Sequence, residues 1–296
     1  AIIFTACKSA THRPVPGKAA RSLPRLHPPA TERQGKILKG GKEMKKIKYE
    51  IYLTGNTHVH IQDGNRKLGK GIYTINLLAG DEPLTKKDGT QLVNISGTCG
   101  GCCDGCKGDC YAIRTQIFRN NGIPSWTENT ILAKQDINTF FKEIQQFIDR
   151  NMVAAIRFHS FGEIPSYEYL LRMVQLAKEN PTISFYTYTK RFSWIERYLE
   201  DHKLLPNNLV INMSIWHKNY SNPYGLPEFI YDDGTEEDVA KLPHCPAVDK
   251  NGHETGITCS NCKRCLRAKN GSKIAVFHSA MSMGQRLDEF KRIKEG

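Results

Sequence analysis

The sequence predicts an α/β fold, a TIM-like full or partial (βα) barrel with a cysteine-rich C-terminal metal-binding extension. Three observations lead to this prediction. From residue 72 on, short runs rich in β-branched residues alternate with helical patterns. One of these runs, Leu209–Ile215, is apolar over most of its length, as in a strand buried on both faces of a parallel sheet. Four cysteines, at positions 245, 259, 262 and 265, lie close to one another late in the chain.

The barrel strands and helices are predicted from residue patterns. The predicted strands are Ile72–Leu78, Val153–His159, Ile183–Thr189, Leu209–Ile215 and Lys273–His278. The predicted helices are Tyr111–Asn120, Gln135–Arg150, Ser166–Glu179 and Phe192–Glu200. The helix over 166–179 has the clearest pattern, because its apolar residues from Tyr169 to Ala177 fall on one stripe. In such folds the functional site lies at the carboxyl ends of the strands.

The first 43 residues differ in composition from the remainder. They hold 9 of the 42 Lys and Arg but only 2 of the 30 Asp and Glu, and they show neither helical nor strand periodicity. Codons for Lys39-Gly40-Gly41 can resemble a bacterial ribosome-binding site just before Met44. We expect Met44 to be the native start, and the alternative is a disordered basic tail. The predicted units are this extension (1–43), the barrel (44–240) and the C-terminal cysteine segment (241–296).

Charge and hydropathy exclude some classes of function. The net charge is +12, but residues 1–43 contribute +7 of it, so the inference of a polyanionic partner is weak. A hydrophobic fraction of 39% is enough for a folded core. No apolar run reaches the roughly 18–20 residues of a membrane span. We therefore expect a cytoplasmic protein without a membrane partner.

Nine of the ten cysteines form two groups. The first group comprises Cys99, Cys102, Cys103, Cys106 and Cys110, and the second comprises Cys245, Cys259, Cys262 and Cys265. In a reducing compartment disulfides are disfavoured, and spacings of two or three residues let a tight turn direct two thiolates to one metal. The same spacings suit disulfide geometry poorly. We therefore expect both groups to bind metal.

The spacing suggests iron–sulfur clusters more than zinc. The run Cys259-x2-Cys262-x2-Cys265 with one distant partner is closer to a bacterial ferredoxin than to paired zinc knuckles, although zinc stays the alternative. In the first group, Cys99-x3-Cys103-x2-Cys106 has the three-cysteine spacing of the radical SAM superfamily. Other triplets, such as Cys102, Cys106 and Cys110, remain open.

Polar residues follow several predicted strands. Arg157 and His159 end one strand, Lys190 follows the next, and Asn212 lies on a third. One such residue would mean little, but a cluster at each of several strand ends predicts a pocket there. We expect these four residues to line it.

Two resemblances point in the same direction. The run from Gly162 and Glu163 to Pro165 resembles the Gly-Gly-Glu-Pro element of radical SAM enzymes, with Phe161 in place of the first glycine. Residues 72–280 resemble the phage gene product 88 family of radical-SAM-like, cysteine-rich proteins. The matching motifs are Cys106-x3-Cys110-Tyr111-Ala112, Arg157-x-His159-x2-Gly162, Phe185-x2-Tyr188-Thr189-Lys190-Arg191, Pro206-Asn207-Asn208-Leu209, Ser214-x-Trp216 and the late cysteine run.

The resemblance implies a cofactor, partners and a place in the cell. It implies one or two [4Fe-4S] clusters and S-adenosylmethionine (SAM), whose amino group Gly162 and Glu163 would hold. The cluster on Cys99, Cys103 and Cys106 would give SAM one electron, releasing a 5′-deoxyadenosyl radical that acts on a nucleotide, a nucleic acid or another substrate. An electron donor such as flavodoxin or ferredoxin, and the cytoplasm of a phage-infected host cell, are also implied.

Two other functions compete with this expectation. The first is a non-catalytic zinc or iron–sulfur protein that binds nucleic acid. Its contacts would come from basic residues near Trp216 and Tyr188, namely Lys190, Arg191, Lys263, Arg264 and Arg267. The second is a hydrolytic metal site at His58-x-His60, although this pair of residues is common on ordinary strands.

Overall fold

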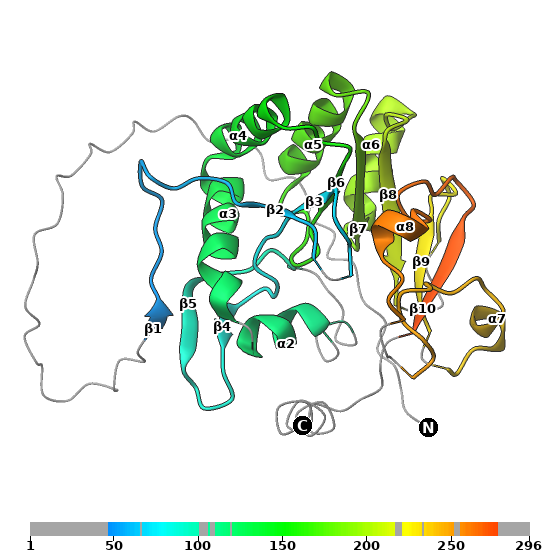
Figure 1. Cartoon of the computed structure of the whole chain (residues 1–296), viewed down its shortest axis with the longest axis horizontal. Coiled ribbons are helices and arrows are strands. Elements are labelled where there is room, and N and C mark those ends of the chain that lie inside the picture. The colour runs from blue at the N-terminus through cyan, green and yellow to red at the C-terminus, as the bar shows by residue number, and fades with distance from the viewer. Residues whose placement is uncertain are drawn as a thin grey trace, which may run out of the picture. The chain divides into compact units, whose positions relative to one another are not determined.

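A computed structural model of the chain gives the architecture shown in Figure 1. It describes residues 47–65, 67–100, 106, 110–118, 120–216, 221–232, 234–251 and 255–277. The chain divides into two units, Ala1–Lys46 and Ile47–Gly296, and all described residues belong to the second unit. The predictions for residues 1–43 and Met44 therefore lie outside the described residues.

The main sheet has seven strands in the order β10-β9-β8-β7-β6-β3-β2. Six of them run parallel, and β2 pairs antiparallel with β3 at one edge. The strands are β2 (Ile61–Asp63), β3 (Ile72–Ile75), β6 (Ala155–Phe158), β7 (Ser184–Thr189), β8 (Leu209–Ile215), β9 (Glu228–Asp232) and β10 (Lys273–Phe277).

From β3 to β10, the order of the parallel strands across the sheet is the same as their order along the chain. Helices α4 (Ile137–Arg150), α5 (Tyr167–Glu179) and α6 (Phe192–His202) stand next to one another along this sheet in Figure 1. Among the described residues no strand pairing joins β2 to β10, and these two strands are the edges. The full-barrel form of the prediction is therefore not found, and the fold is an α/β arrangement around an open, mostly parallel sheet.

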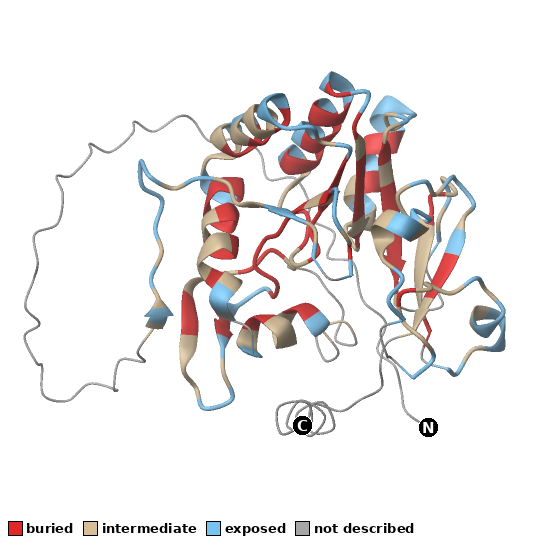
Figure 2. Ribbon diagram, viewed as in Figure 1, coloured by how far each residue is buried: buried red, intermediate tan, exposed pale blue. Residues whose placement is uncertain are grey.

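The core forms where the apolar stripes of the helices meet the sheet, as the buried residues of Figure 2 show. The stripe predicted on α5 is confirmed, because Tyr169, Met173 and Ala177 are completely buried. Ser166 begins this helix by accepting a hydrogen bond from the Tyr169 backbone nitrogen at 3.1 Å. The ring of Phe158 on β6 stacks on that of Phe185 on β7, with centroids 6.1 Å apart.

A second, three-stranded sheet has the order β1-β5-β4, from β1 (Ile47–Tyr49), β5 (Gln91–Ser96) and β4 (Pro83–Thr85). It shares a small apolar core with α2 (Tyr111–Phe118) and α3 (Ile123–Gln135). The remaining elements are one 3-10 turn (Asn120–Gly122), α7 (Glu237–Ala240) and α8 (Cys259–Cys262). None of the helices in the described ranges combines the length and apolar character of a membrane span.

The predicted elements are found with shifts of a few residues, and the strand Leu209–Ile215 is found with its predicted bounds. The helix α3 was not predicted, because it buries the polar residues Thr127, Asn129 and Thr130 and so lacks an apolar stripe. The strand β10, predicted as Lys273–His278, pairs with β9 and belongs to the main sheet.

Candidate metal and cofactor site

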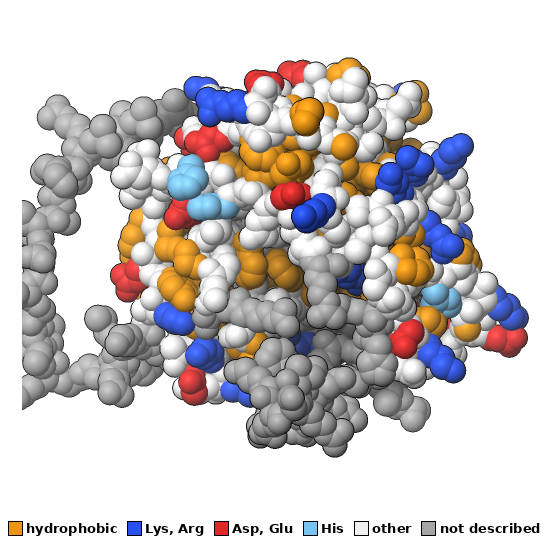
Figure 3. Space-filling view, in the orientation of Figure 1, with side chains coloured by type: hydrophobic (Ala, Val, Ile, Leu, Met, Phe, Trp, Pro, Cys, Tyr) orange, Lys and Arg blue, Asp and Glu red, His pale blue; other side chains and the backbone are white. Residues whose placement is uncertain are grey.

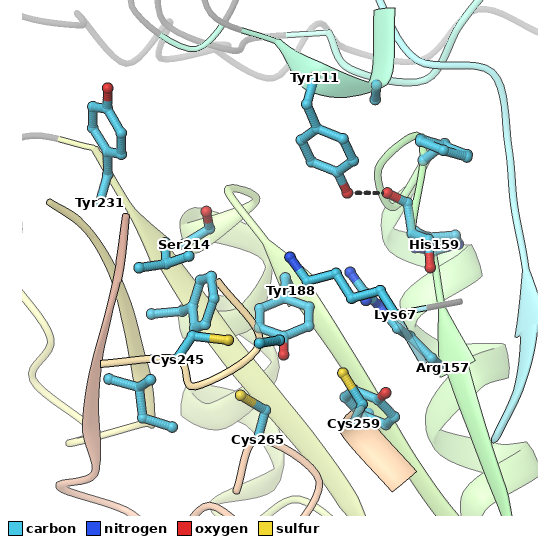
Figure 4. A pocket seen from close by; sticks show the side chains of 18 of the residues that line it. Lys67, Tyr111, Arg157, His159, Tyr188, Ser214, Tyr231, Cys245, Cys259 and Cys265 are labelled. Atoms are coloured by element: carbon cyan, nitrogen blue, oxygen red, sulfur yellow. Dashed lines mark hydrogen bonds between the residues drawn. The ribbon is translucent and has the colours of Figure 1, made fainter. Parts of the chain in front are cut away.

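A cavity lined by residues of both cysteine groups, called the main cavity below, opens at the carboxyl ends of the parallel strands. It has a volume of about 470 Å³ and is shown from close by in Figure 4. Strand ends supply Arg157, His159, Lys190, Trp216 and Tyr231. Cysteines of both groups line it as well: Cys99, Cys106, Cys110, Cys245, Cys259, Cys262 and Cys265. The topology therefore brings together two groups that are more than a hundred residues apart in sequence.

The first cysteine group is held by the segments around β5 and α2. The backbone nitrogen of Cys99 donates to the Gly80 carbonyl at 3.0 Å. The sulfur of Cys110 lies 3.5 Å from the Ile113 nitrogen in the first turn of α2. Helix N-termini favour negative charge, so this position suits a thiolate. Cys102 and Cys103 lie outside the described residues.

The second cysteine group is fixed by contacts to distant parts of the chain. The Cys259 nitrogen donates to the Lys67 carbonyl at 3.0 Å, and the Cys245 nitrogen donates to Ala275 on β10 at 2.8 Å. Asn212 on β8 donates to the Cys265 carbonyl at 3.2 Å. Burial raises the pKa of Cys265 to about 11, although a hydrogen bond with Tyr188 lowers it. A bound cation would reverse this effect, because it stabilises the thiolate.

The cysteine sulfurs are spread more widely than a single small ion requires. No three cysteine sulfurs among the described residues lie within 4.8 Å of one another. A tetrahedral zinc ion with Zn–S bonds of about 2.3 Å places its sulfurs about 3.8 Å apart. A four-iron cluster is larger and holds its cysteines farther apart. Among the described residues, no three cysteine sulfurs are therefore spaced as the ligands of one zinc ion.

The charges of the cavity are strongly unbalanced. Its lining contains six Lys and Arg side chains and one carboxylate, that of Glu163. Arg157 places its guanidinium 4.8 Å from the ring centre of Tyr188, and Lys190 places its ammonium 5.4 Å from that of Trp216. Burial alone would lower the pKa of Lys190, but the Cys106 thiolate and neighbouring anions raise it above its usual value. Seven cysteines share this lining, so the cations can balance either cysteine thiolates or an anionic group of a ligand.

Glu163 is used within the fold. Its Oε1 accepts from the Thr189 hydroxyl at 2.7 Å, and its Oε2 accepts from the Lys190 backbone nitrogen at 2.8 Å. The carboxylate thus joins the loop after β6 to the end of β7. Gly162 has φ +83°, and a Cβ there would lie 2.8 Å from that of Leu77. Both predicted SAM-binding residues line the cavity, and both also have structural contacts.

His159 lines the cavity as predicted and is 3% exposed. Burial, reinforced by the charge of Arg157, lowers the pKa of His159 to about 3, so the imidazole is neutral. Its Nε2 lies 3.0 Å from the Tyr169 hydroxyl, whereas its Nδ1 has no hydrogen-bond partner in the described part of the chain. The buried Nε of Arg157 and the Tyr186 hydroxyl also have none. Three such atoms around one cavity indicate a polar ligand.

Asn212 is placed differently from its prediction. It is not among the cavity-lining residues, and its amide donates to the carbonyls of Thr187 and Cys265, both at 3.2 Å. The side chain therefore fixes the cysteine loop on the sheet and does not face the cavity.

Of the aromatic lining, Tyr188 and Trp216 were singled out from the sequence, whereas Tyr186 was not. Tyr186 lies two residues before Tyr188 on β7 and so faces the same side, which the strand pattern could have shown. Tyr111, which donates to the Ser160 carbonyl (Figure 4), follows Cys110 directly in sequence. Lys67 comes from the loop before β3, and no sequence signal places it at the cavity.

A comparison with known families gives one match. The family model described as Gene product 88 matches residues 59–274, which include all the described cavity cysteines and nearly the whole main sheet. No curated protein and no solved structure matches the chain.

Proposed function

The chain belongs to the Gene product 88 family of phage proteins, and on this premise we propose that it is a radical-SAM-like iron–sulfur protein. In this proposal it reductively cleaves SAM to modify a nucleotide, a nucleic acid or another substrate. The observation that carries the proposal is the convergence of both cysteine groups on one cavity. The sequential order of the parallel strands supports it, because such an order corresponds to part of a TIM-like barrel with its site at the carboxyl ends.

The donor set supports an iron–sulfur cofactor on each side of the cavity. Cys99 and Cys106, with Cys103 by its spacing and Cys110 as the alternative, would hold the cluster next to SAM. Three thiolates leave one iron open to the amino and carboxylate groups of SAM. The second group, with four cysteines, would saturate an auxiliary cluster. When bound, the cluster supplies the electron that cleaves SAM.

The protein's own residues would bind and orient the cofactor and the substrate. Arg157 and Lys190 have no carboxylate at salt-bridge distance among the described residues, so their charges are available to the SAM carboxylate or to a substrate phosphate. The free Nδ1 of neutral His159 and the Tyr186 hydroxyl offer further hydrogen bonds. Tyr188 and Trp216 add aromatic surface to the cavity, next to the cations of Arg157 and Lys190. These groups together favour a nucleotide-like ligand.

The test begins with anaerobic expression and analysis of iron, sulfide and zinc. Two clusters require about eight irons per chain and a brown protein that absorbs near ~400 nm. A dithionite-driven assay would then show 5′-deoxyadenosine. Cys106→Ala should abolish this product, whereas Lys87→Ala, at an exposed position outside both groups, should leave it unchanged. Colourless protein with one or two zincs, after reconstitution has also failed, would overturn the proposal.

A second candidate function is non-catalytic binding of nucleic acid, with bound metal serving only to stabilise the fold. An open groove beside α8 is lined by the exposed cations Lys263, Arg264, Arg267, Lys269 and Lys273, without a carboxylate among its lining residues. Figure 3 shows several basic side chains on the side of the molecule that carries α8 and β10. Lys263 and Arg264 also line the main cavity, so the groove adjoins it.

Salt-dependent DNA binding tests this second candidate. The slope of log K against log salt should fall by about one for each phosphate contact removed, as in Arg267→Ala or Lys269→Ala. Lys87→Ala, in the turn between β4 and β5, is the matched control and should keep the wild-type slope. Equal slopes for all four proteins would exclude this groove as the binding surface.

A further inference from the structure

We propose that the chain holds a divalent transition-metal ion such as zinc, outside the cysteine cavity, through His58, His60 and Glu128. One ligand atom from each of these residues lies within 4.8 Å of the other two. The histidines lie in the segment before β2, and Glu128 lies on α3. None of the three lines the main cavity, so the site is separate from the proposed clusters.

The geometry is close to that of a tetrahedral ion. Bonds of about 2.0–2.1 Å place neighbouring ligand atoms about 3.3 Å apart. The His60 Nε2 and the Glu128 Oε2 are 3.0 Å apart, and the third ligand atom needs only a small side-chain movement to reach this spacing. Two imidazoles and a carboxylate are a typical zinc donor set with one position left for water.

The histidines are oriented by contacts behind them. The His58 Nδ1 lies 3.1 Å from the Asn56 carbonyl oxygen, which fixes the proton on Nδ1 and leaves Nε2 as the ligand atom. The ring centroids of His58 and His60 are only 4.4 Å apart. A hydrogen bond from the second ring nitrogen to a backbone carbonyl, like that of His58 to Asn56, is characteristic of histidines that bind metal.

The backbone of the segment is fixed on the helices. The His60 nitrogen donates to the Asn129 Oδ1 at 2.7 Å, and the Asn129 Nδ2 donates back to the His60 carbonyl at 3.0 Å. The Val59 nitrogen donates to the Glu143 Oε2 at 2.7 Å. These bonds hold both histidines opposite Glu128 before any ion arrives, which reduces the entropy lost on binding.

The simpler alternative is an ordinary ion pair of His60 with Glu128. Such a pair explains two of the three residues and leaves the approach of His58 without a role. The side chains of His60 and Glu128 are 28% and 25% exposed, and His58 is exposed, so an ion can reach the site from solvent. The ion would join the segment before β2 to α3.

Cobalt(II) binding by the full chain distinguishes the metal site from the ion pair. Cobalt on cysteine thiolates gives an intense near-ultraviolet charge-transfer band, whereas cobalt on nitrogen and oxygen ligands gives only visible d–d bands. We expect the wild type to bind one more cobalt ion per chain than His58→Ala or Glu128→Gln, with the same thiolate band. Glu128→Gln retains a hydrogen-bond partner for His60 and so guards against misfolding.

His202→Ala, a change of another exposed histidine on α6, is the matched control and should bind cobalt like the wild type. The proposal is overturned if His58→Ala and Glu128→Gln bind as many cobalt ions as the wild type. It is also overturned if the ion that they lose carries the thiolate band, because that ion would belong to the cysteines.

Discussion

At the scale of single residues, burial keeps the imidazole of His159 neutral in the cavity. His159 has φ +60°, an unusual backbone conformation for a non-glycine residue, and this places its ring in the interior at the end of β6. A neutral imidazole there can accept or donate a hydrogen bond without adding to the charge of Arg157. Burial of this imidazole also makes the stability of the folded protein depend on pH.

The folded protein should lose stability as the pH falls below about 6.5, in part because of His159. The unfolded chain takes up a proton on this imidazole near its ordinary pKa of 6.5, whereas the folded chain does so only near a pKa of about 3. Between these values unfolding takes up one proton, so the free energy of unfolding falls by up to about 1.4 kcal/mol per pH unit.

Urea unfolding of the wild type and His159→Asn at several pH values measures this effect. Asparagine tolerates a positive φ and does not titrate, so the variant should show a weaker dependence on pH between 6.5 and 4. His202→Asn, at an exposed position, should keep the wild-type dependence. An unchanged slope in His159→Asn would contradict the prediction.

Gly162 should tolerate no side chain. Its φ is +83°, and a Cβ added there would lie 2.8 Å from the Leu77 side chain, so Gly162→Ala should lower the free energy of unfolding by about 2–4 kcal/mol. Gly225→Ala is the control, because Gly225 has φ +61° but nothing within 4 Å of the same position. It should cost only about 1 kcal/mol. Equal losses in thermal unfolding would show that the approach to Leu77 is unimportant.

At the scale of elements, the side chain of one asparagine links the end of a helix to the starts of two strands. The Asn208 Nδ2 lies 2.9 Å from each of the carbonyl oxygens of Ala177, Asn180 and Ile183, and so joins the end of α5 to the starts of β7 and β8. The sequence Pro206-Asn207-Asn208-Leu209 thus has a structural explanation that does not involve the cavity.

Asn208→Ala should therefore lower the free energy of unfolding by about 2–3 kcal/mol, because it leaves carbonyl groups without their donor. Asn207 is exposed, and Asn207→Ala is the matched control with an expected change within about 0.5 kcal/mol. Chemical denaturation measures both. A loss shared by the two variants would argue that the turn, and not the amide, is responsible.

Local patterns predicted five of the six parallel strands and α4, α5 and α6, since these elements have apolar runs or stripes that pack in the core. They did not predict β9, and they could not predict α3, whose buried Asn129 and Thr130 satisfy distant backbone groups. The sequence divided the cysteines into two groups, but it did not predict that the described cysteines of both groups line one cavity. Lys67 and the displacement of Asn212 depend on how the second cysteine group packs, which no local pattern encodes.

At the scale of the whole molecule, the second cysteine group joins regions that are distant in the chain. It contacts the loop at Lys67, the strand β8 through Asn212 and the edge strand β10. If this group holds a metal cofactor, removing it should lower the melting temperature by several degrees and expose residues 243–267 to proteolysis.

Chelation under anaerobic conditions, followed by thermal unfolding and limited proteolysis, measures this effect. Cys262→Ser should reproduce the change without chelator, and Lys87→Ala, at an exposed position between β4 and β5, should not. Identical melting and cleavage of the treated and untreated wild-type protein would contradict a structural role for the bound metal.

The sequential order of the strands also bears on how the molecule is made. Each parallel strand after β3 can pair with a strand that has already left the ribosome, so the sheet can grow in one direction during synthesis. The cavity cannot form in that way, because Cys259 must return to Lys67 at the other end of the described chain. If the second cysteine group holds a metal, loading of that metal can therefore begin only after Cys259 to Cys265 have left the ribosome and folded back to Lys67.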